Sequence, residues 1–181
     1  MMTAPAPTPV CDGLSARGLL PVMDSAARVA TVVLAGARDV QLRIKNATPQ
    51  QLFHEVTEAQ RVCAEQGARL WVNDHWRVAV ACGVYGIHVG QEDLVAMSLS
   101  DLHEIAYAGL RLGISTHTYT ELARAIAVRP SYISLGPIFE TTSKKVGFAP
   151  QGLAKLSRWR KLIPHAIPLM AIGGISRAAA P

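Results

Sequence analysis

One stretch near the start of the chain decides the fold: Leu19-Leu20-Pro21-Val22-Met23-Asp24-Ser25-Ala26-Ala27. It predicts a β-strand over 19–23 that passes directly into a helix, with Asp24 in the capping position. A dinucleotide-binding, doubly wound sheet needs the pattern G-x-G-x-x-G at this turn, and the stretch contains no glycine. The turn therefore favours a closed barrel of alternating strands and helices over the doubly wound sheet.

The same strand–helix unit recurs along the chain at intervals of roughly twenty to thirty residues, which is the spacing of βα units. The strands are nearly continuous in apolar residues, as in a parallel sheet buried on both faces. We therefore predict an α/β fold, a TIM (β/α)8-type barrel. The predicted strands are 19–23, 40–44, 69–72, 86–89, 110–115, 132–135 and 167–172, and the predicted helices are 25–34, 49–65, 75–82, 98–107, 119–128 and 150–162. Expected helix caps are Asp24, Thr48 and Ser98, and glycines that close helices are Gly36, Gly67, Gly83 and Gly109.

Composition excludes several classes of protein. Half of the residues are apolar and 17% are charged, which argues against disorder. The longest uncharged apolar stretches, 29–37 and 78–87, fall short of the roughly 20 residues of a membrane helix. Three cysteines without paired spacing favour a reducing, cytoplasmic setting. The net charge of +5 is scattered, so we expect neither nucleic acid nor membrane as a partner, and a homo-oligomer is left open.

The length sets an expectation about domain organisation. Residues 1–17, rich in proline and alanine, are expected to form a flexible N-terminal tail, and residues 18–181 a single barrel domain. A typical barrel of this kind needs about 250 residues. With 181 residues, the chain is expected to be an incomplete barrel from which the eighth βα unit is missing.

Polar residues gather where the predicted strands end, which is where a barrel carries its functional groups. In the second strand, Gln41, Arg43 and Lys45 alternate with Leu42 and Ile44, so the three polar side chains point to one side. Polar groups facing a barrel interior are costly without a ligand, although an edge strand with a solvated face is the alternative. An arginine and a lysine together indicate a phosphate ligand.

Two carboxylates follow the neighbouring third and fourth strands. Asp74 comes directly after the third strand, and Asp93 lies shortly after the fourth. Taken singly, Asp74 is more simply a helix cap and Asp93 an ordinary loop acid. Beside Arg43 and Lys45, the pair favours a site for Mg²⁺, which takes carboxylate, phosphate and water oxygens.

The later strands end in hydroxyls and glycines. Ser115-Thr116-His117 closes the fifth strand, and Gly173-Gly174 closes the seventh, where backbone amides can approach a phosphate. The connection 136–150 is long for a compact domain, and its hydroxyls followed by lysines favour a lid that closes over an anion.

Together these segments resemble the thiamine-phosphate synthase family. The resemblance rests on Val40-Gln41-Leu42-Arg43-Ile44-Lys45, Trp71-Val72-Asn73-Asp74, Gly86-Ile87-His88-Val89-Gly90-Gln91-Glu92-Asp93, Leu112-Gly113-Ile114-Ser115-Thr116-His117, Gly136-Pro137-Ile138-Phe139 and Ala171-Ile172-Gly173-Gly174-Ile175. It implies a transferase of thiamine biosynthesis that condenses 4-amino-2-methyl-5-hydroxymethylpyrimidine diphosphate with 4-methyl-5-(2-phosphoethyl)thiazole, forming thiamine phosphate and diphosphate with Mg²⁺ as cofactor.

The resemblance also implies roles for individual residues. Asp74 and Asp93 would bind Mg²⁺, and Arg43, Lys45 and Lys144 would act in catalysis. The implied substrate-binding residues are Gln41, Leu42, Arg43, Ile44, Lys45, Asn73, Ser115, Thr141, Thr142, Ser143, Lys144 and Gly174.

Other functions stay open at this point. A truncated, inactive or regulatory relative would keep the pyrimidine-diphosphate site and bind its ligand without turnover. A thiazole tautomerase of the same fold would not need Arg43, Lys45, Asp74 and Asp93. A nucleic-acid-binding module would need a basic stripe or an aromatic platform, which this sequence lacks.

Overall fold

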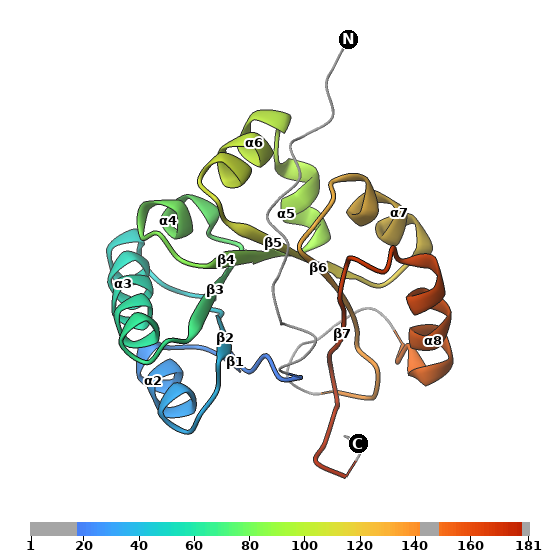
Figure 1. Cartoon of the computed structure of the whole chain (residues 1–181), viewed down its shortest axis with the longest axis horizontal. Helices are drawn as coiled ribbons and strands as arrows, with labels where there is room; N and C mark the ends of the chain where they lie inside the picture. The colour runs from blue at the N-terminus through green and yellow to red at the C-terminus, as the bar shows by residue number, and fades with distance from the viewer. Residues whose placement is uncertain (1–17, 142–148, 179–181) are drawn as a thin grey trace.

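The computed structural model describes residues 18–141 and 149–178 of the chain. Its sheet runs in sequence order, and every strand pairs in parallel with the next. Figure 1 shows the strands curled into an arc with the helices on its outer side. The predicted α/β fold of TIM-barrel type is confirmed. Within the described residues the sheet has seven strands: β1 (Val22–Met23), β2 (Asp39–Leu42), β3 (Arg69–Asn73), β4 (Gly86–Val89), β5 (Arg111–Thr116), β6 (Tyr132–Leu135) and β7 (Leu169–Ala171).

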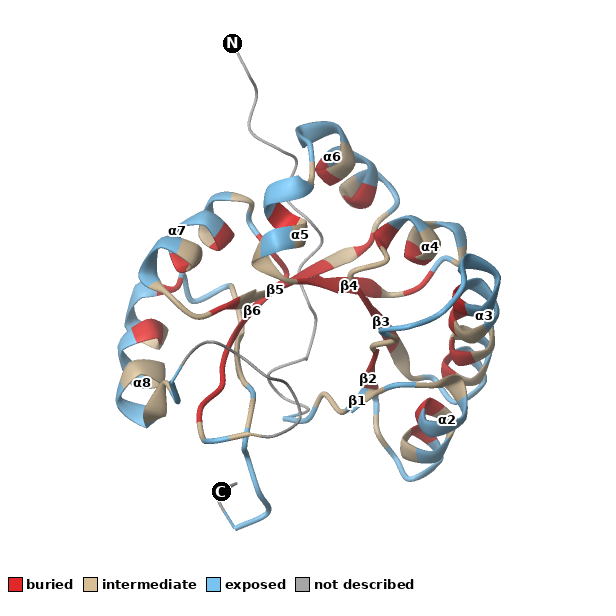
Figure 2. Cartoon of the chain, turned by 180° about the vertical axis from the view of Figure 1, so that it is seen from behind, coloured by how far each residue is buried: buried red, intermediate tan, exposed pale blue. Residues whose placement is uncertain are grey.

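The helices bury their apolar sides against the outer face of the sheet. Figure 2 shows buried residues along the strands and on the helix sides that face them. Val40 and Leu42 of β2 and Leu70 and Val72 of β3 point into this outer core. The helices are α2 (Ala26–Leu34), α3 (Pro49–Glu65), α4 (Trp76–Ala81), α5 (Gln91–Ala96), α6 (Leu99–Tyr107), α7 (Tyr119–Ala127) and α8 (Gly152–Leu162).

The predicted elements are present, with differences at their ends. The bounds of β4, β6 and α3 are those predicted, whereas β1 and β7 are shorter than predicted. The prediction of a strand over 40–44 is corrected to Asp39–Leu42, because the pairing with β3 ends at Leu42. The helix α5 is absent from the prediction, since its 6 residues are too few to show a helical period.

Helix caps agree with the sequence at two of three positions. Thr48 and Ser98 cap α3 and α6, each in a reciprocal capping box. The prediction that Asp24 caps the first helix is wrong, because the Ser25 side chain accepts the hydrogen bond from the Arg28 N–H (3.4 Å). Asp24 instead forms an exposed ion pair with the Arg28 side chain at 3.2 Å. The four glycines predicted to close helices all have positive φ.

An aromatic cluster fills the inner face of the sheet. Trp71 meets Tyr132 edge to face, with ring centroids 4.9 Å apart, and meets Tyr85 in the same way at 5.3 Å. Two glycines make room for these rings. A Cβ on Gly113 would lie 2.2 Å from the Tyr132 ring, and one on Gly86 would lie 2.6 Å from Trp71. The glycines therefore allow large aromatic side chains on the inner face of the curled sheet.

We expect Gly113→Ala to destabilise the protein by about 1–3 kcal/mol, because the added methyl group overlaps the Tyr132 ring. Urea unfolding followed by circular dichroism measures the loss. In the Gly113→Ala background, Tyr132→Val removes the overlap, so the double variant should lose less than the sum of the two single losses. Wild-type stability in Gly113→Ala would contradict the packing described here.

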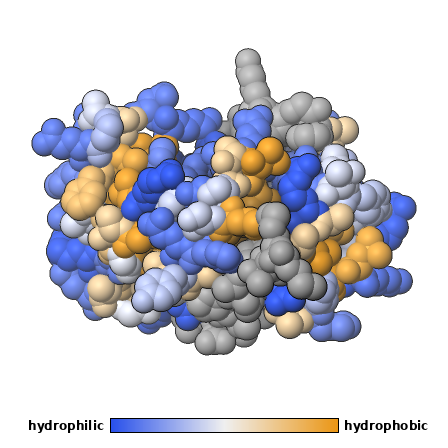
Figure 3. All heavy atoms as spheres, turned by 90° about the horizontal axis from the view of Figure 1, so that it is seen from above, coloured by the Kyte–Doolittle hydropathy of each residue, from blue (hydrophilic) through white to orange (hydrophobic). Residues whose placement is uncertain are grey.

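Two further features concern the outside of the molecule. No helix in the part of the chain that the structure describes combines the length and apolarity needed to cross a bilayer. Figure 3 views the α6 side, where hydrophilic side chains cover much of the surface and apolar ones lie in separate patches. The predicted N-terminal tail over residues 1–17 lies outside the described residues.

Candidate active site

The carboxyl ends of β2 to β5 bring the predicted site residues to one edge of the sheet. Because these strands are parallel and adjacent, Asn73 of β3 lies opposite His88 of β4, and Ser115 of β5 lies opposite Ser134 of β6. A pocket of about 360 Å³ opens beside this edge, between α4 and the α5–α6 segment. Asp74 and Asp93 both line it.

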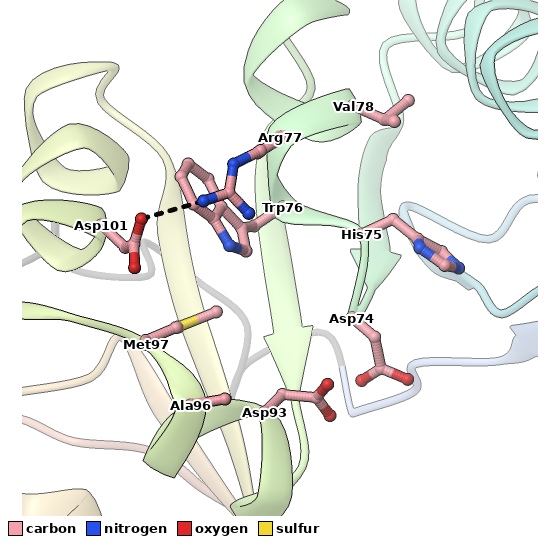
Figure 4. Close-up of a pocket in the computed structure, with 9 residues that line it drawn as sticks. All are labelled: Asp74, His75, Trp76, Arg77, Val78, Asp93, Ala96, Met97 and Asp101. Atoms are coloured by element: carbon pink, nitrogen blue, oxygen red, sulfur yellow. Dashed lines mark hydrogen bonds and ion pairs between the residues drawn. The ribbon is translucent and has the colours of Figure 1, made fainter. Parts of the chain in front are cut away.

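Asp74 and Asp93 face each other at the end of β4 (Figure 4). Asp74 follows β3 with a left-handed backbone, φ 64°, and its N–H donates to the His88 carbonyl at 2.8 Å. A left-handed conformation is uncommon for a residue other than glycine, and such strain gathers at functional sites. Asp74 does not cap α4, because His75 occupies the cap position there.

Asp93 reaches the same point from a different element. It lies in the first turn of α5, after Gly90 at the cap, so it is a helical residue and not the loop acid of the simpler alternative. A carboxylate in this position is favoured by the helix dipole. The β4 end and the start of α5 therefore hold Asp93 toward Asp74.

The negative charge of the two carboxylates is only partly offset by nearby positive groups. Burial raises the pKa of Asp74, the neighbouring Asp93 charge raises it further, and the charges of Arg43 and His75 oppose the rise. Within the described residues no group of three or more His, Cys, Asp and Glu side chains gathers as a metal site. Two carboxylates alone fit Mg²⁺, which completes its shell with phosphate and water oxygens.

The segment after β2 supplies the predicted phosphate ligands. Arg43 is half-buried and Lys45 is exposed, and the Arg43 charge acts on Asp74. Gln41 is buried on the inner side of β2. Leu42 packs its side chain into the outer core, so any contact that it makes with a ligand is through its backbone. Ile44 presents its carbonyl 3.5 Å from the His75 ring.

A buried polar layer lies on the inner face beside these ends. The His88 ring bonds the Tyr132 hydroxyl through Nδ1 (2.6 Å) and the Ser115 hydroxyl through Nε2 (2.7 Å). Ser115 Oγ lies 3.4 Å from Ser134 Oγ. Gln41, Asn73, His88 and Ser134 are each at most 7% exposed. His88, Tyr132 and Ser134 are not among the site residues predicted from the sequence, although inward-facing polar positions in apolar strands were the available signal.

The predicted thiazole-phosphate residues are only partly within the described chain. Thr142, Ser143 and Lys144, and with them most of the predicted lid, lie outside the described residues. Thr141 is half-buried, and Gly174 lies close to it, since a Cβ on Gly174 would be 2.3 Å from the Glu140 carbonyl. Gly174 has φ 68°, which favours glycine. The β7 end is thus held against the start of the predicted lid.

A sequence model of the family described as thiamine monophosphate synthase matches residues 15–181. The chain belongs to the thiamine monophosphate synthase family. A thiamine-phosphate synthase from Yersinia pestis (strain Pestoides F) is 50% identical over 159 residues, which are 88% of this chain and 72% of that protein. One from Photorhabdus laumondii is 46% identical over 164 residues, or 91% of this chain and 74% of the relative. The family is one of transferases.

A solved structure of a thiamine monophosphate synthase relative supports the same assignment. The thiamine phosphate pyrophosphorylase from Pyrococcus furiosus superposes with a TM-score of 0.75 at 27% identity, covering 90% of this chain and 78% of that one. The curled parallel sheet is therefore the family fold.

Proposed function

We propose that the protein condenses 4-amino-2-methyl-5-hydroxymethylpyrimidine diphosphate with 4-methyl-5-(2-phosphoethyl)thiazole to give thiamine phosphate and diphosphate. The pair of facing carboxylates, Asp74 and Asp93, beside Arg43 is the observation that carries this proposal. A thiazole tautomerase would have no use for this cation and diphosphate site. The family supports small-molecule substrates, and we propose Mg²⁺ as the cofactor and the cytoplasm as the location.

The charged residues of the site have two proposed roles, which are to bind the diphosphate and to neutralise its charge. Asp74 and Asp93 would hold Mg²⁺, which when bound supplies positive charge for the leaving diphosphate. Arg43 and Lys45 bind diphosphate oxygens and favour the charge that develops as the bond to the pyrimidine methylene breaks. No protein nucleophile is required, because the aminopyrimidine ring stabilises the resulting cation and the thiazole nitrogen attacks it.

The remaining residues orient the two substrates. Gln41, Asn73 and Ser115 lie on the inner side of the sheet, and they are proposed to hold the pyrimidine substrate. Thr141 and Gly174, together with Thr142 and Ser143, are proposed to bind the thiazole phosphate. Lys144 is proposed to contact the pyrimidine substrate and add a third positive charge.

Metal removal tests this function directly. With both substrates and Mg²⁺, we expect thiamine phosphate and diphosphate to form in equal amounts, and EDTA to abolish both products until Mg²⁺ is restored in excess. Chromatography of the two products measures the outcome. Undiminished turnover in EDTA would refute the assigned metal site.

The same preparation separates the enzyme from a binding protein without turnover. Isothermal titration calorimetry with the pyrimidine diphosphate and Mg²⁺ measures binding independently of chemistry. Binding without either product would favour the inactive or regulatory relative, and product formation excludes it.

A further inference from the structure

A row of hydrogen bonds on the inner face runs from Tyr132 of β6 to His88 of β4, and from there to Ser115 of β5. The Tyr132 hydroxyl lies 2.6 Å from His88 Nδ1, and His88 Nε2 lies 2.7 Å from Ser115 Oγ. Both distances are short for such contacts. Tyr132 is 1% exposed and His88 5% exposed. The row thus connects a buried tyrosine to a hydroxyl at the substrate edge.

The surrounding packing leaves this row little freedom. The Tyr132 ring is held edge to face by Trp71 and stacks on His88 with ring centroids 5.5 Å apart. The Gly113 position admits no side chain beside it. The backbone of Ser115 is held as well, since the Gln91 side-chain amide donates to its carbonyl at 2.8 Å.

The chemistry of the two hydroxyls determines which group donates and which accepts in each hydrogen bond of the row. A phenol is a stronger acid than an alkyl alcohol, so it is the better hydrogen-bond donor and the poorer acceptor. In the neutral form of the His88 ring, Tyr132 therefore donates to Nδ1 and the ring proton lies on Nε2. Nε2–H then donates to Ser115 Oγ. The remaining contact of Ser115, to Ser134 Oγ at 3.4 Å, is long for a bond between hydroxyls, so the Ser115 proton is available to a ligand.

We propose that His88 and Tyr132 are positioning residues that turn the Ser115 hydroxyl into a hydrogen-bond donor toward the substrate. Ser115 then recognises an acceptor, a ring nitrogen of the pyrimidine, and does not accept from the exocyclic amino group. This proposal rests on the proposed function, in which Ser115 contacts the pyrimidine. It assigns a role in specificity to two residues that act through Ser115.

Steady-state kinetics of a double-mutant cycle test the proposal. Ser115→Ala should lower kcat/KM for the pyrimidine diphosphate about 10-fold, and Tyr132→Phe about 5-fold, through loss of one hydrogen bond. In the Ser115→Ala background, Tyr132→Phe should have almost no further effect, because it acts through that hydroxyl. Additive losses would overturn the proposal.

Tyr85→Phe provides the matched control. Tyr85 packs on the same Trp71 ring, but its hydroxyl accepts from Arg69 (3.2 Å) at the opposite end of the strands. Its loss should leave kcat/KM for the pyrimidine diphosphate unchanged. An equal decrease in Tyr85→Phe would show that Tyr132 acts only by stabilising the aromatic cluster.

A second readout does not depend on activity. ¹⁵N NMR of the histidine-labelled protein, with the His88 signals assigned through His88→Gln, should show a neutral ring protonated on Nε2. Tyr132→Phe should change the protonation pattern, because the donor to Nδ1 is lost. A proton on Nδ1 in the wild type, a doubly protonated ring, or an unchanged spectrum in Tyr132→Phe would overturn the proposal. A wild-type chain with the expected spectrum but no thiamine phosphate synthesis would refute the proposed function alone.

Discussion

Asp74→Asn should lower turnover by about 10²- to 10³-fold while the protein stays folded. The change removes one of two facing carboxylates, so the remaining Asp93 binds a divalent cation weakly. Asparagine keeps the shape of the side chain and adopts a left-handed backbone more readily than other residues, which suits φ 64° at this position. Asp93→Asn should have an effect of similar size. Initial rates over a range of Mg²⁺ concentrations measure both losses.

Asp74→Asn should also stabilise the metal-free protein. The folded pKa of Asp74 lies above its ordinary value of 3.8, because burial and the Asp93 charge disfavour ionisation. Between the ordinary pKa of Asp74 and its pKa in the folded protein, the unfolded chain binds fewer protons than the folded chain. The stability of the fold therefore decreases as the pH rises through this range. At neutral pH in EDTA, Asp74→Asn should unfold a few degrees above the wild type. At a pH below the ordinary pKa of Asp74, the difference in unfolding temperature should disappear.

Glu92→Gln is the matched control for the carboxylate pair. Glu92 is exposed, adjoins Asp93 in the first turn of α5 and carries the same charge, but it does not line the pocket. It should leave turnover and the Mg²⁺ requirement unchanged. Full activity of Asp74→Asn in saturating Mg²⁺ would refute the assigned metal site, and so would an equal loss in Glu92→Gln.

The fold could be predicted from the sequence where the signal is local. The strands β4 and β6 are short apolar runs bounded by turn residues, and their bounds agree with the prediction. The end of β2 could not be predicted in the same way. The alternation of polar and apolar residues continues through Ile44, although pairing with β3 stops at Leu42. Alternation reports which side a residue faces and not whether a neighbouring strand is present.

In the candidate site, too, one part could be predicted from the sequence and another could not. The order of the parallel strands brings Asp74 and Asp93 to one edge, as predicted from the sequence. The left-handed backbone of Asp74 has no sequence signature, since it is imposed by its hydrogen bond to β4 and by the start of α4. The contact between His88 and Tyr132 joins positions 44 residues apart, which no local period reveals. Long-range pairings of inward-facing side chains therefore needed the structure.

Asp39→Asn should cost about 3–5 kcal/mol of stability, the range for breaking a buried ion pair from one side. Asp39 is fully buried, and its two oxygens accept from Arg69 Nε and Nη2, both at 2.6 Å. Its Oδ1 also accepts from the Trp71 indole at 3.3 Å. Asparagine cannot provide the charge or accept at both positions. Thermal and urea unfolding measure the loss, which corresponds to a decrease of about 10 °C in Tm.

A second variant tests whether the loss comes from the broken pair. Replacing both partners, Asp39→Leu with Arg69→Met, removes the charge on both sides and should restore part of the stability. A double variant as unstable as the sum of both single changes would contradict this origin.

The Asp39–Arg69 pair lies where β2 and β3 begin, whereas Asp74 and Asp93 lie beyond the strand ends. In barrels of this type, residues where the strands begin contribute to stability, and residues at the strand ends contribute to activity. Asp39→Asn should therefore lower Tm with little change in kcat of the folded protein, whereas Asp74→Asn should lower kcat while raising Tm in EDTA.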